Sequence, residues 1–194
     1  MPEGDDVLQI HSERKLTYDD FLLFPEDDGL RHELIDGVHY VSPCPNTKHQ
    51  QVSGNLYWLL RSYLELHPRG RLFYAPFDVV FSRFDVVEPD LLYMSHERAA
   101  EVLTEKHIEG SPDLVIEIGS PSTHRRDETI KRRLYEGSGV SEYWIVDPVL
   151  DLLRVHRREG DGVAPPVHLS REGRDRLVSP LFPGLELSLD EVFR

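Results

Sequence analysis

Cysteine, long apolar runs and basic residues are all scarce in this sequence. The single cysteine, Cys44, excludes an internal disulfide and a cysteine-based metal cluster. No apolar run approaches the roughly 20 residues that a transmembrane helix requires. The N-terminal segment MPEGDDVLQIHSERK has neither the basic start nor the apolar stretch of a signal peptide. We therefore expect a cytoplasmic protein with no membrane association.

The charge balance is acidic, and the charges are unevenly distributed along the chain. The sequence has 22 Lys and Arg residues against 35 Asp and Glu residues, which gives a net charge of -13. A general, high-affinity nucleic-acid binder is usually basic, so this balance argues against that class of protein. It leaves open an enzyme with one local basic surface, because basic residues are concentrated between residues 124 and 133.

The N-terminal half predicts a flexible tail, a hairpin and a long helix. Residues 1–16 show no apolar periodicity. Residues 17–194 are enough for a single domain with a substantial core. Asp36-Gly37 separates two apolar-rich segments and predicts a type I′ hairpin turn. The pattern T-x-x-Q at residues 47–50 predicts a capping box for a helix that ends near His67.

Buried strands and a crossover helix are predicted in the middle of the chain. Residues 86–94 and 113–118 are short apolar segments, each associated with a Pro-Asp pair. A helix capped by Asp127 separates the second segment from a third predicted strand at residues 140–146. This strand–helix–strand order implies parallel strands with the helix packed on the sheet. The predicted fold class is α/β or α+β with a mixed central β-sheet.

An acidic residue inside the second strand is the clearest chemical signal. Glu117 lies between Ile116 and Ile118, and a charged group in such a run is costly to bury without compensation. Asp90 lies on the preceding predicted strand. Two carboxylates on neighbouring strands repel each other, and a divalent cation relieves the repulsion. With a backbone carbonyl they form an oxygen site suited to Mg²⁺ or Mn²⁺.

A lysine on the following helix extends this group. Lys131 and Tyr135 are one helical turn apart and share a face with Asp127. A lysine close to the carboxylates can orient water and stabilise the negative charge that develops on a phosphate. Together these side chains predict a site for phosphodiester hydrolysis.

These residues resemble the PD-(D/E)xK nuclease superfamily. Pro89-Asp90 matches the PD element, and Glu117-Ile118-Gly119 occupies the (D/E)xK position with glycine in place of lysine. Several branches of the superfamily carry the lysine on the next helix, where this chain has Lys131. The resemblance narrows to the Uma-two family, a domain of unknown function described as a restriction endonuclease. It covers residues 17–193 and is carried by the segments RHELIDGVHYVSP, VEPDLLYMS, PDLVIEIGSPST and RRDETIKRRLYEGSGVSEYWIVDP.

This resemblance implies a restriction-endonuclease-like fold, with helices flanking the mixed sheet and with N-terminal and C-terminal β-hairpins. It also implies metal-dependent cleavage of DNA. The implied ligands of Mg²⁺, for which Mn²⁺ would substitute, are Asp90, Glu117 and the carbonyl of Ile118. Lys131 is then the catalytic lysine, and Glu33 is an additional catalytic acid that binds the metal directly or through water. Because members of this fold often act as dimers, we also expect a homodimer.

The same residues also have structural interpretations. Glu33 fits a solvent-facing acid on a hairpin strand equally well, and Lys131 on its own fits an exposed helix lysine. Asp113 is predicted to serve as a turn or cap at the start of its strand. Tyr135 is predicted to pack in the core, with a supporting role at the site as the alternative. His49 is predicted to be structural, with phosphate binding as the alternative.

Three functions are compatible with these features. The first is a Mg²⁺-dependent endonuclease that hydrolyses DNA phosphodiester bonds. The second is a non-catalytic interaction or dimerisation module that keeps the nuclease fold, and a divalent-metal site would argue against it. The third is a metal hydrolase that acts on a small phosphate ester, which a test of DNA dependence would distinguish from the first.

Overall fold

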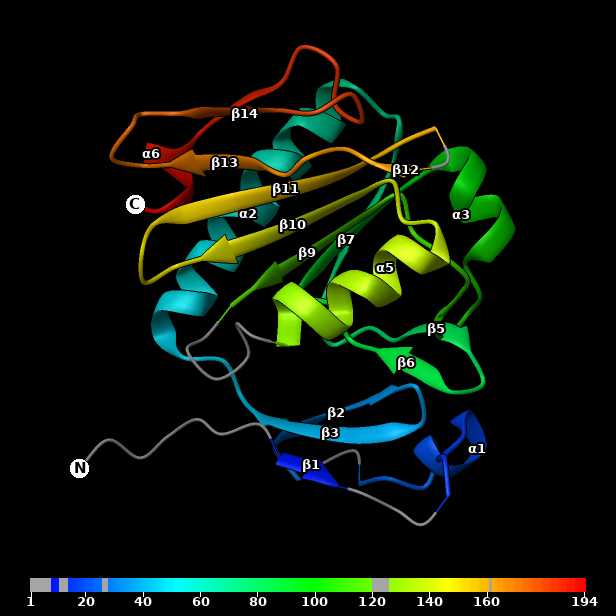
Figure 1. Ribbon diagram of the computed structural model, residues 1–194. Helices are drawn as coiled ribbons and strands as arrows, with labels where there is room; N and C mark the ends of the chain where they lie inside the picture. The colour runs from blue at the N-terminus through cyan, green and yellow to red at the C-terminus, as the bar shows by residue number, and fades with distance from the viewer. Residues whose placement is uncertain (1–7, 11–13, 26–27, 120–125, 161) are drawn as a thin grey trace, which may run out of the picture.

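Two large β-sheets with helices packed on them dominate the protein, as the computed structural model shows (Figure 1). The structure describes residues 8–10, 14–25, 28–119, 126–160 and 162–194. Within these ranges, no helix combines the length and the apolar character needed to cross a membrane.

The central sheet contains seven strands among the described residues. In spatial order they are β12 (Gly162–Val163), β11 (Leu152–Glu159), β10 (Glu142–Asp147), β9 (Leu114–Ile118), β7 (Leu91–Ser95) and β4 (Gly70–Tyr74), with β13 (Val167–Ser170) also paired to β11. β9 runs parallel to β10, whereas β7, β4, β11 and β13 pair antiparallel with their neighbours. The sheet is therefore mixed, and the parallel pair is the one predicted from the crossover.

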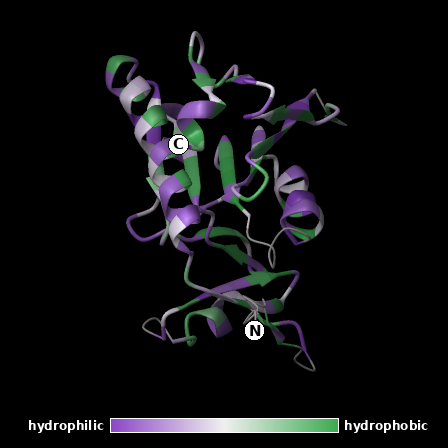
Figure 2. Ribbon diagram, turned by 90° about the vertical axis from the view of Figure 1, so that its left-hand side faces the viewer, coloured by the Kyte–Doolittle hydropathy of each residue, from purple (hydrophilic) through white to green (hydrophobic). Residues whose placement is uncertain are grey.

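Helices cover both faces of the central sheet, and Figure 2 shows the apolar strands between them. One face packs against α2 (Thr47–Leu66) and α6 (Leu189–Val192), and the other packs against α5 (Arg132–Ser138). Successive side chains of a strand point to opposite faces. Accordingly, Ile116 and Ile118 of β9 join the apolar core beside α2, and Val115 joins the core beside α5.

A second sheet lies below the central one in Figure 1. Its strands, in spatial order, are β1 (Leu8–Ile10), β3 (Val38–Pro43), β2 (Leu30–Ile35), β6 (Asp85–Val87), β5 (Val79–Ser82) and β8 (Ile108–Glu109). β2 and β3 form the hairpin predicted around Asp36-Gly37. Asp36 and Gly37 have φ of 52° and 72°, the left-handed conformations that a type I′ turn requires.

Strand β1 lies within residues 1–16, where a flexible tail was predicted, and residues 1–7 and 11–13 lie outside the described residues. Leu8 to Ile10 pair antiparallel with β3, from Leu8 opposite Val41 to Ile10 opposite His39. The side chains of β1 are exposed. Backbone pairing rather than side-chain burial therefore holds this strand, which is why its hydrophobic pattern did not reveal it.

The strand predicted over residues 86–94 is divided between the two sheets. Its first part is β6 in the second sheet, and its second part is β7 in the central sheet. Pro89 lies at the break, and a proline has no amide hydrogen to donate to a strand ladder. As a result, Asp90 lies where the chain passes from one sheet to the other.

Helix α2 begins where predicted, but its cap is a different residue. The side chain of Asn46 accepts a hydrogen bond from the amide of His49, at 3.0 Å. The predicted capping box of Thr47 and Gln50 is therefore wrong by one residue, because Asn46 takes the N-cap position and is an equally good cap. The predicted end is confirmed, with Leu66 as the last helical residue and His67 as the C-cap.

The crossover helix contains a π-helical turn that was not predicted. This turn, η1 (Asp127–Lys131), continues directly into α5, which ends at Gly139 with φ of 92°. Asp127 is inside the turn and Arg126 occupies the position before it, so the predicted capping role of Asp127 is wrong. π-helical turns are rare and frequently occur at functional sites. The remaining elements are α1 (Tyr18–Phe21), α3 (His96–Val102), β14 (Arg176–Val178) and β15 (Glu186–Ser188), the last two forming a C-terminal hairpin.

Candidate active site

The two carboxylates predicted to bind metal come from adjacent strands. β7 and β9 pair antiparallel with Leu91 opposite Ile116, and extending this register by one residue places Asp90 opposite Glu117. Residues opposite each other in an antiparallel pair point to the same face of the sheet. Both carboxylates are 3 % exposed. The backbone amide of Ile118 donates a hydrogen bond to Oδ2 of Asp90, at 2.7 Å.

Lys131 connects two buried glutamates. Its Nζ lies 2.8 Å from Oε1 of Glu117 and 2.7 Å from Oε1 of Glu33. Lys131 is 1 % exposed and Glu33 is 0 % exposed, so neither is the solvent-facing side chain of the structural interpretation. The Tyr135 hydroxyl donates to the same oxygen of Glu117, at 2.6 Å. We call Glu33, Asp90, Glu117 and Lys131 the buried charge cluster.

Arginine and histidine side chains compensate the Asp90 end of the buried charge cluster. Arg31 Nη1 lies 3.0 Å from Oδ1 of Asp90, and His49 Nε2 lies 3.0 Å from Oδ2. Arg31 also pairs through Nε with Glu88, at 2.9 Å. Burial raises the pKa of Glu88 to about 7, although Arg31 opposes this shift. Asp90 is thus held by two side chains from outside the central sheet, one from β2 and one from α2.

A second arginine lies at the Glu33 end. Arg126 Nη2 is 3.2 Å from Oε2 of Glu33, and its guanidinium lies over the ring of Tyr40 at 5.5 Å from the centroid. The backbone amide of Glu88 donates to Oε1 of Glu33, at 3.0 Å. Glu33 therefore receives a lysine, an arginine and a backbone amide, which explains how a fully buried carboxylate is tolerated on β2.

The electrostatic surroundings push the three carboxylates in different directions. Burial raises the pKa of Glu117 to about 8, with Lys131 opposing the shift and neighbouring carboxylates adding to it. Burial also acts on Glu33, but the charges of Lys131 and Arg126 outweigh it and lower the pKa of Glu33 to about 2. At Asp90, Arg31 and the His49 hydrogen bond likewise overcome burial and lower the pKa. Charged partners therefore lower the carboxylate pKa at Glu33 and Asp90, whereas burial raises it at Glu117.

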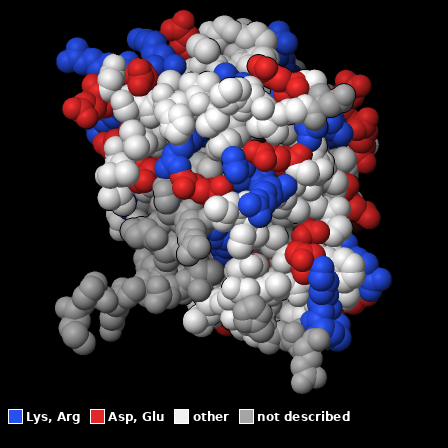
Figure 3. Space-filling view, viewed as in Figure 1, with Lys and Arg blue, Asp and Glu red and all other residues white. Residues whose placement is uncertain are grey.

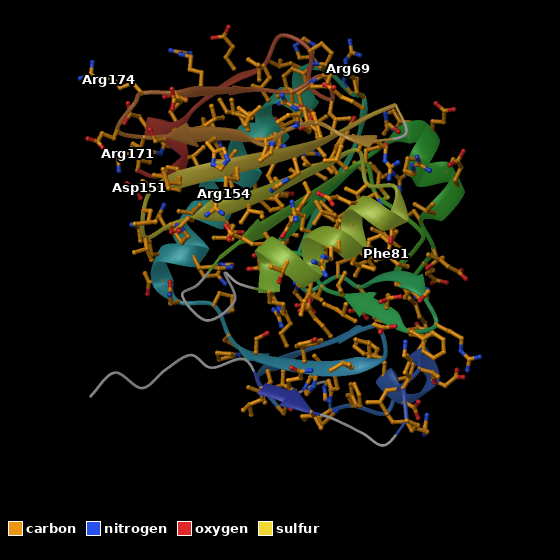
Figure 4. All side chains as sticks on the ribbon, in the orientation of Figure 1. Arg69, Phe81, Asp151, Arg154, Arg171 and Arg174 are labelled. Atoms are coloured by element: carbon orange, nitrogen blue, oxygen red, sulfur yellow. The ribbon has the colours of Figure 1, made fainter. Side chains whose placement is uncertain are left out.

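Local structure explains how these side chains meet. Proline at the β6–β7 break brings Asp90 to the edge of the second sheet, close to Arg31 on β2. The π-helical turn ends at Lys131, and Tyr135 follows one turn later on the face towards β9. Phe81 of β5 packs beside Tyr135, with ring centroids 5.8 Å apart, and lies below α5 in Figure 4. The site therefore lies between the central sheet, α5 and the second sheet.

The donor set fits a hard divalent cation in part. Asp90 and Glu117 offer carboxylate oxygens on one face, and Mg²⁺ in proteins is commonly bound by one or two carboxylates with water completing its shell. Across the described ranges, no group of three or more His, Cys, Asp or Glu side chains is gathered closely enough to hold a metal ion. Glu33 is engaged by Lys131 and Arg126. The residues thus fit a cation held by two carboxylates and a backbone carbonyl, with Glu33 outside its immediate ligands.

The residues around the buried charge cluster were only partly predicted from the sequence. Tyr135 and His49 were expected mainly to pack, and both contact the buried charge cluster. Asp113 accepts a hydrogen bond from the amide of Ser95, at 2.7 Å, and is not among the cluster contacts. Arg31 and Arg126 were not predicted. Arg31 alternates with Glu33 on one strand, and this spacing was the available signal because both side chains share a face.

Comparison with known proteins identifies relatives of this chain. A family model described as "Putative restriction endonuclease", Uma2, matches residues 18–190. A solved structure titled "putative nuclease belonging to DUF820", from Anabaena variabilis ATCC 29413, is similar with a TM-score of 0.76 and 22% sequence identity. The match covers 92% of this chain and 97% of that chain, which shows a shared fold. No curated protein matches this sequence.

The family model spans most of the chain, including every strand of the two sheets except β1 and every member of the buried charge cluster. The structural match covers nearly the same extent and agrees with the restriction-endonuclease-like fold expected from the sequence. The chain therefore belongs to the Uma2 family of restriction-endonuclease-like proteins.

Proposed function

We propose that this protein is a metal-dependent endonuclease that hydrolyses DNA phosphodiester bonds. The observation that supports this most strongly is the contact of Lys131 with Glu117, at 2.8 Å, beside Asp90 on the adjacent strand. Two carboxylates and a lysine in one buried site are what metal-assisted phosphodiester hydrolysis requires. Membership in a family described as restriction endonucleases supports the same reaction class.

In this proposal Asp90, Glu117 and the carbonyl of Ile118 hold Mg²⁺ or Mn²⁺. When bound, the cation polarises the scissile phosphate and lowers the pKa of a bound water. The Nζ of Lys131 would donate a hydrogen bond to the attacking water or to the phosphate oxygens, where negative charge develops. Glu117, which pairs with Lys131 in this structure, would hold the cation instead.

The surrounding residues position this group. The Tyr135 hydroxyl holds one oxygen of Glu117, which fixes the orientation of the other. Glu33 keeps Lys131 charged and aligned through its 2.7 Å contact. Arg31 and Arg126 offset the negative charge of the carboxylates before substrate binds. A homodimer would supply two such sites for the two strands of a duplex.

A non-catalytic module is the competing function, and one observation favours it. Asp90 and Glu33, as well as Glu117, are already paired with cationic side chains of the same chain. Such internal compensation would let the fold persist as a scaffold without metal. A scaffold gives no reason for metal affinity at Glu117, so metal binding distinguishes the two.

Cleavage assays test the proposal. We expect nicking or cutting of DNA in Mg²⁺ by the native protein, loss of this activity in Glu117→Gln, and full activity in Glu186→Gln, which changes an exposed glutamate of β15. Hydrolysis of a small phosphate ester but not of DNA would replace this proposal with the small-ester hydrolase. Equal DNA cleavage by both variants would contradict the assigned site.

A further inference from the structure

Helix α2 has a second face, of which only Tyr57 packs against the apolar core. Gln50, Ser53, Gly54 and Tyr57 recur at positions one turn apart, so they share one side of the helix. None of them is fully buried, and the buried side chains of α2 lie elsewhere on the helix. These residues line a cavity of about 370 Å³. The rest of its lining is Arg31, Pro45, His49, Tyr74, Ala75 and Asp90.

The cavity reaches the buried charge cluster at Asp90. His49 and Arg31 both line it, and both contact the Asp90 carboxylate at 3.0 Å. His49 is 8 % exposed, and its Nδ1 has no hydrogen-bond partner within the described part of the chain. A buried polar atom without a partner is unfavourable in the free protein. A molecule that enters this cavity therefore meets the ion pair of Arg31 with Asp90 and one unsatisfied ring nitrogen beside the proposed metal ligands.

Gly54 is an unusual residue for the middle of a long helix. Glycine destabilises a helix interior relative to alanine. A Cβ built on Gly54 would meet no atom within 4 Å, so packing against the protein does not require glycine here. The missing side chain instead leaves room in the cavity for the flat side of a ligand to approach the helix backbone.

Two tyrosines form the outer part of the cavity. Tyr57 and Tyr74 make an edge-to-face pair with ring centroids 5.0 Å apart. Tyr74 is 59% exposed, which leaves its ring available at the cavity mouth. Exposed aromatic rings beside amide and hydroxyl groups, here those of Gln50 and Ser53, suit a planar heterocycle that both stacks and forms hydrogen bonds.

We propose that this cavity binds one unpaired nucleobase of the nucleic-acid substrate, next to the phosphate that lies at Asp90 and Glu117. The inference rests on the proposed nuclease function and adds the substrate class: single-stranded DNA, or a duplex from which one base is turned out. Tyr74 stacks on the base, Gln50 and Ser53 hydrogen-bond its edge, and Arg31 faces the adjoining phosphate. A cavity of this volume is in the size range of small-ligand sites.

The acidic charge of the protein disfavours a ligand that is held mainly through phosphate contacts. Affinity for duplex DNA depends largely on basic side chains that neutralise phosphates, whereas this chain has a net charge of -13. On the face shown in Figure 3, Lys and Arg side chains are interspersed with Asp and Glu. Stacking on aromatic rings adds affinity that does not require a basic surface.

Binding in the absence of metal tests this inference without relying on cleavage. Fluorescence anisotropy in EDTA would compare a short labelled single strand, the same sequence as a duplex, and a strand of equal length whose sugars carry no bases. We expect the single strand to bind tightest. Tyr74→Ala should weaken its binding roughly 5- to 150-fold, the usual range for the loss of one stacked base. Gly54→Leu should weaken it similarly while leaving the melting temperature unchanged or higher.

Matched variants control for unrelated effects. Trp58→Ala removes an exposed aromatic one residue from Tyr57 that does not line the cavity, and Gly137→Leu fills open space on α5. Both should bind the single strand within about twofold of the native protein. Equal binding of the strands with and without bases, or no effect of Gly54→Leu, would overturn the inference. So would a free nucleoside monophosphate that binds as tightly as the strand.

The two proposals can fail separately. If DNA is not cleaved in Mg²⁺ but base-dependent binding is lost in Gly54→Leu, the nuclease proposal fails and the cavity assignment stands. If DNA is cleaved through Glu117 and Gly54→Leu cleaves and binds single strands normally, the nuclease proposal stands and the cavity assignment fails.

Discussion

The two faces of strand β9 differ in the chemistry of the side chains that they carry. Ile116 and Ile118 point to the face beside α2, where they join a continuous apolar core. Glu117, between them, points to the face beside α5, where it meets Lys131 and Tyr135. One strand thus separates a face that provides stability from a face that carries charge.

The difference follows from the covering helices. α2 presents apolar side chains such as Leu56 and Leu60 at helical spacing, and these are fully buried against the sheet. The π-helical turn before α5 instead directs Lys131 inward. Burying ionised groups is unfavourable unless each is paired and hydrogen-bonded. The α5 face therefore combines an apolar core, which includes Val115, with a site in which charged side chains are paired.

The largest expected effect is on the charged face. Lys131→Met should reduce the rate of DNA cleavage by about 10³-fold, the usual scale for losing a group that stabilises transition-state charge, and should leave Mn²⁺ binding intact. Single-turnover cleavage beside calorimetric Mn²⁺ titration measures both. Arg133→Met, at an exposed position of the same helix, is the control and should cleave normally.

If Lys131→Met cleaved as fast as the native protein, the assignment of this lysine would be wrong. If it lost Mn²⁺ binding as well as activity, Lys131 would act by shaping the metal site, and the separation of roles between Glu117 and Lys131 would not hold.

The apolar face should respond in the opposite way. Ile116→Ala removes a side chain that is 0 % exposed from the core beside α2. We expect it to lower the free energy of unfolding by about 3 kcal/mol through lost burial and a residual cavity, as urea denaturation would measure. Cleavage per folded molecule should stay within about twofold. A loss of activity as large as that of Lys131→Met would break the distinction between the faces.

The pH dependence of the unfolding free energy gives a further test, through the buried side chain of His156. His156 of β11 is buried, and burial together with nearby arginines lowers its pKa to about 4. The unfolded chain, with a histidine pKa near 6.5, takes up the proton first. The contribution of neutral His156 is therefore complete above about pH 6.5 and is lost as the pH falls towards 4.

We expect neutral His156 to contribute about 1–2 kcal/mol to the free energy of unfolding, allowing for partial solvent screening. His156→Gln should flatten the decline in unfolding free energy between pH 6.5 and 4, whereas His67→Gln, at an exposed position, should not. If the decline in unfolding free energy between pH 6.5 and 4 were unchanged in His156→Gln, the folded protein would not hold His156 in its neutral form.

The smallest predicted effect concerns the start of α2. Asn46→Ala should destabilise the protein by about 1 kcal/mol because the His49 amide loses its acceptor. Thr47→Ala should have a smaller effect, since Thr47 is the first helical residue and not the cap. Thermal denaturation of the two variants checks this order, and the reverse order would restore the capping box predicted from the sequence.

The sequence predicted much of the central sheet because its strands bury both faces. Glu117 was identifiable because it interrupts an apolar run, and the β9–β10 parallel pair followed from the intervening helix. Gly139 ends α5 in the left-handed conformation that favours glycine at a helix C-terminus. Periodicity and turn chemistry are local properties, so they can be read without knowing the fold.

What the sequence did not predict depends on distant contacts. Strand β1 is held by backbone pairing to β3, which leaves no hydrophobic pattern. Arg31 lies 59 positions from Asp90 in the chain, and only the meeting of the two sheets brings them within 3.0 Å. The same meeting turns Glu33 from a candidate surface acid into a fully buried partner of Lys131.

The central claim is that Asp90 and Glu117 form a divalent-metal site. The most direct test is calorimetric titration of Mn²⁺ into the native protein and into Glu117→Gln, with Glu186→Gln as the exposed control. We expect saturable Mn²⁺ binding in the native protein and the control, and none in Glu117→Gln. No binding in the native protein, or equal binding in all three, would contradict it and favour the non-catalytic module.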